Sequence, residues 1–518
     1  MIDARVLHPY SLKFTLCLVF YMPLPHRTIL VAAVYLGTFM ATLAISIVTV
    51  ALPAIQVALH TDLAGLQWVV GSYALSLSAF MLSAGSAGDR YGRKRVWLVG
   101  VGLFTLGSGI SAAAPNLAVL MTGCATQGVG GALLLPGGLS ILTQAFRDPR
   151  ERAHIIGGWS SFGAVSLVLG PMLGGLLVDH VGWPSIFLIN IPIGVLAIGL
   201  GLRGIAESSD PTHAALDPWG QVLSVVFLGA LTYALINVGS GGWTTPATLA
   251  AFLVAAAAFL AFLSVEMRVA RPVLPLDLFR DPSFANINFI SFVLGFSAYT
   301  SLFFFSLFLQ QAQGWSASAT GWRMAPVFVV MAIVSSNFGR LAGRHGTPRL
   351  MLTGYGLIGV AMLAMSSFSP TTPYAVIALL FAVLGCGMGL AVPSTGTAIM
   401  TAAPRERTGA ASSTMNALRQ SGMTLGIALL GSLMSERAVA SLTRNLSSQS
   451  VADASLIAAD MLRGRAPPPG LTVASDILQG LLSQAVADGF SAAATVAGVC
   501  GLVASASLMI VDRKLKNG

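Results

Sequence analysis

Apolar residues run along this chain in long blocks, and short polar stretches separate the blocks. Fourteen blocks have about the 20 residues that a helix needs to cross a bilayer core of about 30 Å. Lone strands would leave backbone groups without partners in lipid, so the blocks predict helices. The predicted helices span residues 28–53, 65–87, 96–114, 117–143, 154–178, 184–202, 216–238, 246–266, 284–310, 321–341, 349–368, 374–402, 411–435 and 489–511.

Composition agrees with helices that face lipid. Hydrophobic residues make up 55% of the 518 residues, charged residues only 9%, and the mean hydropathy is +0.80. Soluble domains carry about 25% charged residues, so the sequence predicts an all-α membrane protein. Four cysteines lie in apolar runs without the spacing of metal ligands, and we expect free thiols, no metal site and no cofactor. These are Cys17, Cys124, Cys386 and Cys500.

Lysine and arginine gather on alternate connections between the predicted helices. With a cytoplasmic N-terminus, the inner connections and the two tails hold most of the 28 basic residues. The outer side holds four, all in one long loop: Arg437, Arg444, Arg463 and Arg465. Because cytoplasmic loops are enriched in Lys and Arg, both termini are predicted to be cytoplasmic. The net charge of +9 is spread along one membrane face, which argues against a nucleic-acid partner.

Two motifs recur at a similar distance along the chain. The segment from Gly85 to Arg95 is echoed from Gly339 to Arg349, 254 residues later. A Gly-rich segment that ends at Pro136 is echoed 257 residues later. These offsets predict a duplicated six-helix bundle with two helices inserted between the copies. The predicted divisions are an N-terminal cytoplasmic segment 1–27, a first bundle 28–202, a linker with two inserted helices 203–283, a second bundle 284–512 that includes a long outer loop 436–488 with several prolines, and a cytoplasmic tail 513–518.

The strongest single motif follows the second predicted helix and reads Gly-x-x-x-Asp-Arg-x-Gly-Arg-Lys. Its glycines permit a sharp turn, and its aspartate can interact with a neighbouring arginine or a helix N-terminus. The basic residues alone would indicate only a cytoplasmic anchor, whereas the Gly and Asp pattern and its echo favour a gating loop. The loop residues are Gly85, Asp89, Arg90, Gly92, Arg93 and Lys94.

With this loop the chain resembles the major facilitator superfamily, and more specifically its fourteen-span drug:proton antiporter family. The resemblance implies two six-helix bundles with two inserted central helices. The fifth helix carries small residues every four positions, a stripe that suits close helix packing, and a proline that can bend it. In the family this helix is thought to gate transport, while a plain packing seam is the alternative. Its motif consists of Ser166, Gly170, Pro171, Gly174 and Gly175.

The chain departs from the family at two positions. The family's usual acid in the first helix is replaced by Ala44, and its usual arginine in the fourth helix by Cys124. An unpaired charge inside a membrane is costly, so we interpret the two changes as a paired replacement. No Asp or Glu lies deep in a predicted helix. Asp62 and Asp488 at the outer edge and Asp179 in an outer loop are the carboxylates considered for proton coupling, and the alternative for each is a solvated loop residue.

One ionisable residue, Arg419, is predicted deep in a helix. It either extends toward the cytoplasmic headgroups or lines a cavity, where it would favour anionic or polar groups. The expected substrate path consists of Trp68, Tyr73, Gln127, Asn416, Arg419 and Gln420. Trp68 and Tyr73 have an alternative role as aromatic residues at the membrane interface.

These observations predict a secondary transporter of the cell (inner) membrane that exports amphipathic small molecules, with protons as the family's usual coupling ion. A transporter of a polar or anionic metabolite without standard proton coupling is the second reading, and a non-transporting membrane sensor is a third. No nucleophile elbow, metal cluster or phosphate loop is present in the sequence, so neither an enzyme nor an ATP-driven pump is expected.

Overall fold

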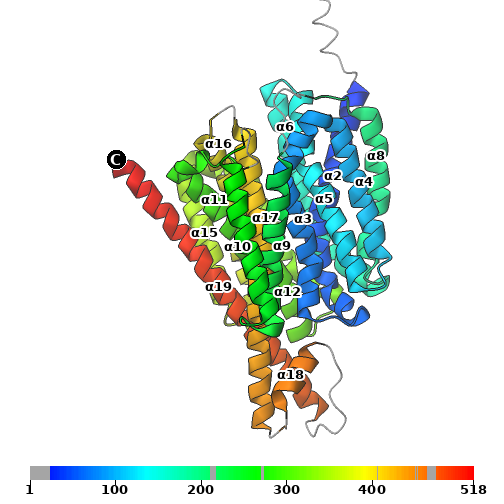
Figure 1. Cartoon of the computed structure of the whole chain (residues 1–518), viewed down its shortest axis with the longest axis vertical. Coiled ribbons are helices and arrows are strands. Elements are labelled where there is room, and N and C mark those ends of the chain that lie inside the picture. The colour runs from blue at the N-terminus through cyan, green and yellow to red at the C-terminus, as the bar shows by residue number, and fades with distance from the viewer. Residues whose placement is uncertain are drawn as a thin grey trace, which may run out of the picture.

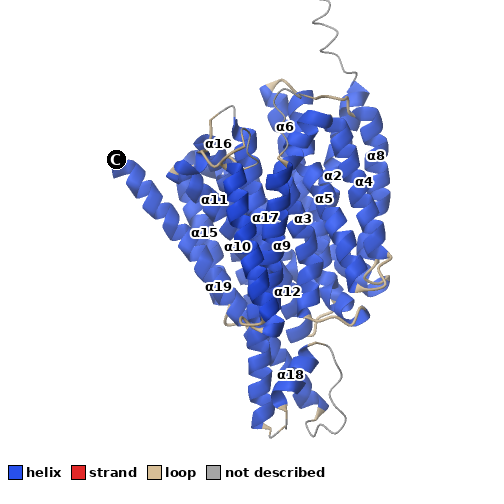
Figure 2. Cartoon of the chain, in the orientation of Figure 1, coloured by secondary structure: helices blue, strands red, loops and turns tan. Residues whose placement is uncertain are grey.

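The computed structural model describes residues 24–209, 217–269, 274–404, 407–449, 451, 453–463 and 474–517. All regular structure in these residues is helical (Figure 2). Fourteen of the described helices or helical runs are long and apolar enough to cross a membrane, which confirms the predicted number. The predicted N-terminal segment lies outside the described residues except for its last four.

Six spans make up the first half of the molecule, and α7 and α8 together form the sixth. Asp62, Asn116 and Asp148 each accept a backbone N–H of the helix that follows, which fixes where three of these helices begin. The helices are α2 (Leu24–Ala58), α3 (Leu63–Tyr91), α4 (Arg93–Ala112), α5 (Leu117–Ala145), α6 (Pro149–His180), α7 (Ser185–Leu188) and α8 (Asn190–Gly204).

The second half also has six spans. Its first span contains two π-helical segments, η2 and η3, a rare form that often occurs at functional sites. The elements are η1 (Leu278–Arg280), α11 (Pro282–Leu294), η2 (Gly295–Tyr299), α12 (Thr300–Leu307), η3 (Phe308–Ala312), α13 (Ala317–Ser336), α14 (Phe338–His345), α15 (Thr347–Met365), α16 (Tyr374–Ala402), α17 (Thr408–Ser448), α18 (Ala454–Leu462) and α19 (Ser475–Asn517).

The two halves have the same turn at equivalent places. Gly92 joins α3 to α4 with φ +101° and ψ +126°, and Gly346 joins α14 to α15 with φ +80° and ψ +143°. A side chain rarely adopts this conformation, so glycine is required for a turn of one residue. The two turns lie 254 residues apart, the offset of the predicted repeat.

The two inserted helices, α9 (Pro218–Gly241) and α10 (Pro246–Glu266), form a hairpin. The helix α9 packs against both α3 and α17, so it covers the line where the two halves meet (Figure 1). Near one end, the Gln221 amide donates to the Ala79 carbonyl at 2.9 Å. Near the other end, the Ser432 hydroxyl donates to the Leu235 carbonyl at 2.5 Å. The hairpin is therefore bonded to both halves.

The prediction of a loop over residues 436–488 is wrong for much of this segment, because most of the residues that the structure describes there are helical. The helix α17 continues to Ser448, and its 41 residues are about 60 Å long. Its end packs with α18 and the start of α19 in a small core of its own, visible below the bundle in Figure 1. Ala438, Leu442 and Leu446 belong to that core. They recur every four residues, which is the spacing of one helix face. Charged residues lie between them, so the mean hydropathy of this stretch is too low to predict a membrane span.

Candidate functional site

The two halves meet along two helix pairs, α3 with α17 and α6 with α13. We call the end of the bundle that carries the Gly92 and Gly346 turns the basic end, because arginines follow the same spacing there in both halves. The other end, where α3 and α13 begin, we call the opposite end. Residues at the junction of the halves are the ones that a substrate would pass.

Near the opposite end, the backbones of α6 and α13 are in direct contact. A Cβ placed on Gly321 would lie 2.1 Å from the carbonyl oxygen of Pro171, and one on Gly175 would lie 2.4 Å from that of Ala317. Distances below 3 Å leave no room for a side chain, so glycine is required at both positions. Two residues of the fifth-helix motif, Pro171 and Gly175, therefore hold the first half against the second.

The rest of that motif packs within the first half. Ser166 is hydrogen-bonded to Thr42 of α2, and a Cβ on Gly170 would lie 1.9 Å from the Ser46 hydroxyl oxygen of the same helix. Gly174 faces the next turn of α2. The predicted stripe of small residues is thus a close contact with α2, and α6 lies between its own half and the other.

Polar side chains also join the halves on the same side of the molecule. The Gln67 amide of α3 is 1% exposed and donates to the carbonyls of Ile427 and Ala428 of α17, at 2.7 and 3.0 Å. Gln311 donates to the Gln56 side-chain oxygen at 2.7 Å. Sequence reasoning missed these roles, since partners as much as 360 residues apart give no local signal.

Asp179 makes a contact between the halves that involves a carboxylate. Its oxygen accepts the backbone N–H of Ser318, at the start of α13, at 2.8 Å. The other edge candidates have partners within their own half. Asp62 accepts the Gly65 N–H at 2.9 Å, and Asp488 accepts hydrogen bonds from Ser441 and Gln484.

A small cavity lies where α2, α3 and α5 face α17. Its volume is about 10 Å³, roughly the room that one water molecule needs. Both departures from the family pattern, Ala44 and Cys124, line it. Apolar side chains dominate its wall, and no carboxylate or basic side chain is part of it. The lining residues are Ala44, Ile45, Val48, Val69, Val70, Tyr73, Cys124, Gln127 and Met423.

Two predicted path residues line this cavity and one does not. The Tyr73 hydroxyl donates to the Ala41 carbonyl at 2.9 Å, and the Gln127 amide donates to the Ser108 hydroxyl at 2.7 Å. Trp68 instead packs with its ring 6.4 Å from that of Tyr233 on α9, and it is not among the lining residues. Ligand stacking on Trp68 therefore has no support in this structure.

The other three predicted path residues lie on α17. The Arg419 guanidinium donates to the Asn416 side-chain oxygen at 2.5 Å and lies 5.5 Å from the centre of the Tyr299 ring. Arg419 and Asn416 are half-buried, whereas Gln420 is buried. Met423, one helical turn beyond Arg419, reaches the cavity.

The predicted gating loop is mostly helix, and only Gly92 forms the turn. Asp89 accepts a hydrogen bond from the Arg93 guanidinium at 2.9 Å. A neighbouring arginine is one of the two partners expected for it from the sequence. A Cβ on Gly85 would meet open space, so Gly85 makes no close helix approach here. Arg90 lies over the ring of Tyr91, at 5.7 Å.

Glu207, in the linker after α8, was not predicted to belong to this loop. Its two carboxylate oxygens accept the backbone N–H groups of Lys94 and Arg95, at 3.1 and 3.3 Å. A carboxylate at a helix N-terminus is favourable, and this one fixes the start of α4. Lys94 also donates to the Leu202 carbonyl at 2.8 Å. The linker therefore holds the loop in place.

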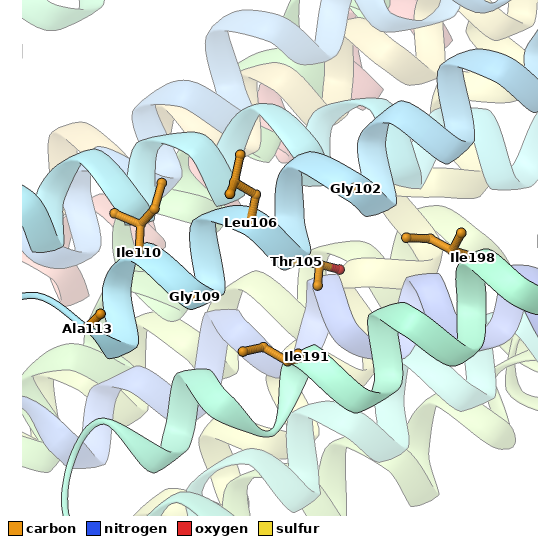
Figure 3. A pocket seen from close by; sticks show the side chains of 8 residues that line it. All are labelled: Gly102, Thr105, Leu106, Gly109, Ile110, Ala113, Ile191 and Ile198. Carbon is orange, nitrogen blue, oxygen red and sulfur yellow. The ribbon is translucent and has the colours of Figure 1, made fainter.

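A shallow groove on the outside of the first half, between α4 and α8, lies away from the junction of the halves (Figure 3). Its polar side chain, Thr105, donates to a carbonyl of its own helix at 2.8 Å, and its rim residue Leu106 is 58% exposed. An apolar wall of this kind suits lipid chains and gives no reason to place transport there. The groove is lined by Gly102, Thr105, Leu106, Gly109, Ile110, Ala113, Ile191 and Ile198.

Solved structures with the same fold are transporters by their descriptions. A bacterial homologue of the human lysosomal transporter Spinster aligns with a TM-score of 0.61 at 20% identity, over 94% of this chain and 98% of that one. The nucleoside transporter NupG aligns with a TM-score of 0.60 at 12% identity, over 92% and 99%. At these identities the likeness establishes the fold alone.

Sequence relatives are closer. The multidrug resistance protein Stp of Mycobacterium tuberculosis is 39% identical over 77% of this chain and 74% of its own length. The methylenomycin A resistance protein of Bacillus subtilis is 37% identical over 76% and 85%. The tetracenomycin C resistance and export protein of Streptomyces glaucescens is 31% identical over 93% and 90%. The family model for the Major Facilitator Superfamily matches residues 34–427, and this chain belongs to that superfamily.

Proposed function

We propose that this protein is a drug efflux transporter that moves amphipathic small molecules out of the cytoplasm through the junction of its two halves. The observation that carries the proposal is the small apolar cavity at that junction, lined by residues of the first half and by Met423 of the second. Relatives that are named for multidrug, methylenomycin A and tetracenomycin C resistance support it. A non-transporting sensor has no comparable support.

Transport requires the two ends of the junction to open in turn. At the opposite end most contacts are backbone against glycine and neutral amides such as Gln67, which can separate without leaving a charge unpaired, and the Asp179 carboxylate is the exception. The equivalent turns at Gly92 and Gly346 then guide closure at the basic end. We propose that the basic end faces the cytoplasm of a cell (inner) membrane, since cytoplasmic loops are enriched in arginine and lysine.

Proton exchange is the coupling that the family resemblance implies, and here we propose an unusual site for it. Ala44 and Cys124 leave the central cavity without a carboxylate. Asp179 is then the strongest candidate, because its bond to Ser318 joins the halves and would be weakened on protonation of the carboxylate. A second candidate function, transport of polar or anionic compounds, is favoured by Arg419, a charged residue within the span α17.

The test is uptake by inside-out vesicles that contain the protein, with a panel of neutral, cationic and anionic amphipathic dyes. We expect uptake of several dyes, faster with an acidic vesicle interior than without a pH gradient. Vesicles with the Asp179→Asn variant should retain uptake but lose its dependence on the gradient. Equal uptake by vesicles with and without the protein, for every dye, would contradict the transporter function. Uptake that ignores the gradient in the wild type would contradict only proton coupling.

A further inference from the structure

Arg419 is a charged residue inside the membrane-spanning part of α17, and no carboxylate is paired with it among the residues that the structure describes. Among the residues that the structure describes, its contacts are the Asn416 amide oxygen and the Tyr299 ring, and the phenol of Tyr355 lies within electrostatic reach. None of these is an acid of the Asp or Glu type. Charged residues inside membranes are ordinarily paired with an opposite charge, so the guanidinium lacks the usual counter-ion.

Depth argues against an arginine that only extends to the headgroups. Arg419 follows the first residue of α17 by 11 positions, about 16 Å along the helix. Tyr299, whose ring the guanidinium contacts, follows the first residue of α11 by 17 positions, about 25 Å along that span. The contact with Tyr299 therefore holds the charge well inside the span.

Close backbone packing builds this arrangement. The π-helix η2 contacts α17 so tightly that a Cβ on Gly295 would lie 1.8 Å from the Arg419 carbonyl oxygen. On the α17 side, a Cβ on Gly422 would lie 2.1 Å from the Phe292 carbonyl oxygen. This contact fixes Tyr299, the last residue of the π-helix, over the guanidinium. Such π-helical turns are rare and occur frequently at functional sites.

The position of Arg419 along α17 relates it to the central cavity. Residues four apart share a helix face, and Met423, four residues on, lines that cavity. A ligand with its charged group at Arg419 would extend along α17 toward Met423. Because the cavity there has a volume of only about 10 Å³, its apolar part fits only when the halves separate. The planar guanidinium suits a carboxylate, which it binds through two parallel hydrogen bonds.

We propose that Arg419, Asn416 and Tyr299 form an anion-binding subsite for the acidic group of an amphipathic aromatic substrate. The inference rests on the proposed transport function for its biological meaning. It narrows the substrate class to weak acids with an apolar body. The subsite makes cationic compounds poor ligands, because they would face an uncompensated positive charge.

The test is calorimetric binding of three matched probes, 1-naphthoate, 1-naphthamide and 1-naphthylmethylammonium, to the purified full chain. The wild type should bind the acid roughly tenfold more tightly than the amide and bind the amine least, because a charge-assisted hydrogen bond is stronger than one between neutral groups. Arg419→Gln should lose that preference, and Arg419→Lys should keep part of it. Arg323→Gln is the matched control, since Arg323 is half-buried over the rings of Trp315 and Tyr374 but lies at the opposite end.

An unchanged preference in Arg419→Gln would overturn the proposal, and so would a wild type that binds the amine best or binds none of the probes. Gel filtration of each variant shows whether it is folded. If Arg419→Gln does not fold, Arg419→Lys, which preserves the charge, provides the comparison with the wild type. Dye uptake by vesicles is measured separately. Uptake without a preference for acids would leave the transport function intact, whereas acid binding without any uptake would leave only the subsite.

Discussion

Replacing Gly321 by valine is expected to reduce drug export roughly tenfold, because a Cβ at this position would lie 2.1 Å from the Pro171 carbonyl oxygen of the other half. Overpacking of this kind costs about 1–3 kcal/mol, and 1.4 kcal/mol shifts a conformational equilibrium about tenfold. The strain falls on the state in which the opposite end is closed. Export of a fluorescent drug from cells, normalised to the amount of protein in the membrane, measures the effect.

The matched control is Gly199→Val, at an exposed glycine of α8 where a Cβ would meet open space. It should export like the wild type. Gly175→Ala, which would place a Cβ 2.4 Å from the Ala317 carbonyl oxygen of the same helix pair, should reduce export as well. Equal export by Gly321→Val and Gly199→Val would show that closure of this end is not part of the transport cycle.

The second large effect concerns the central cavity. Ala44→Asp or Cys124→Arg alone should lower the yield of folded protein several-fold, because an unpaired charge at the centre of a span costs about 2.5–3.5 kcal/mol. The double variant should recover much of the loss, since both positions line the same cavity. Fluorescence-detected gel filtration of the three variants provides the comparison.

Neutral variants of similar size, Ala44→Asn and Cys124→Gln, separate the effect of charge from that of volume. They should lower the yield less than the charged single variants do. If the two charged single variants and the double variant all gave equal yields, the two positions would not be a paired replacement.

The sequence predicted those parts of the fold that depend on local pattern. The number of spans follows from blocks of apolar residues, and the turn at Gly92 follows from a glycine beside charged residues. The stripe of Ser166, Gly170 and Gly174 predicted close packing, and α2 is its partner. Each of these signals is contained within one helix or one connection, where composition and spacing are sufficient.

Other features depend on partners that are distant in the sequence. Nothing around Gln67 indicates that its amide binds carbonyls of α17, and nothing before Tyr299 predicts the π-helix that places its ring over Arg419. The helical end of α17 was also missed, because water-facing charges there lower the local hydropathy. These features are set by tertiary packing.

The central claim is that transport requires the opposite end to open and close, and a reversible lock across that end tests it most directly. Gln311 and Gln56 belong to different halves and their side chains are 2.7 Å apart. In a variant without native cysteines, Gln56→Cys and Gln311→Cys would be joined by a short, reducible bifunctional thiosulfonate. Ser369→Cys with Thr371→Cys, an exposed pair 3.2 Å apart in the connection between α15 and α16 of the second half, is the control. Dye uptake by vesicles should stop on cross-linking between the halves and return on reduction, with the control pair unaffected. Continued uptake by the fully cross-linked protein would contradict the account.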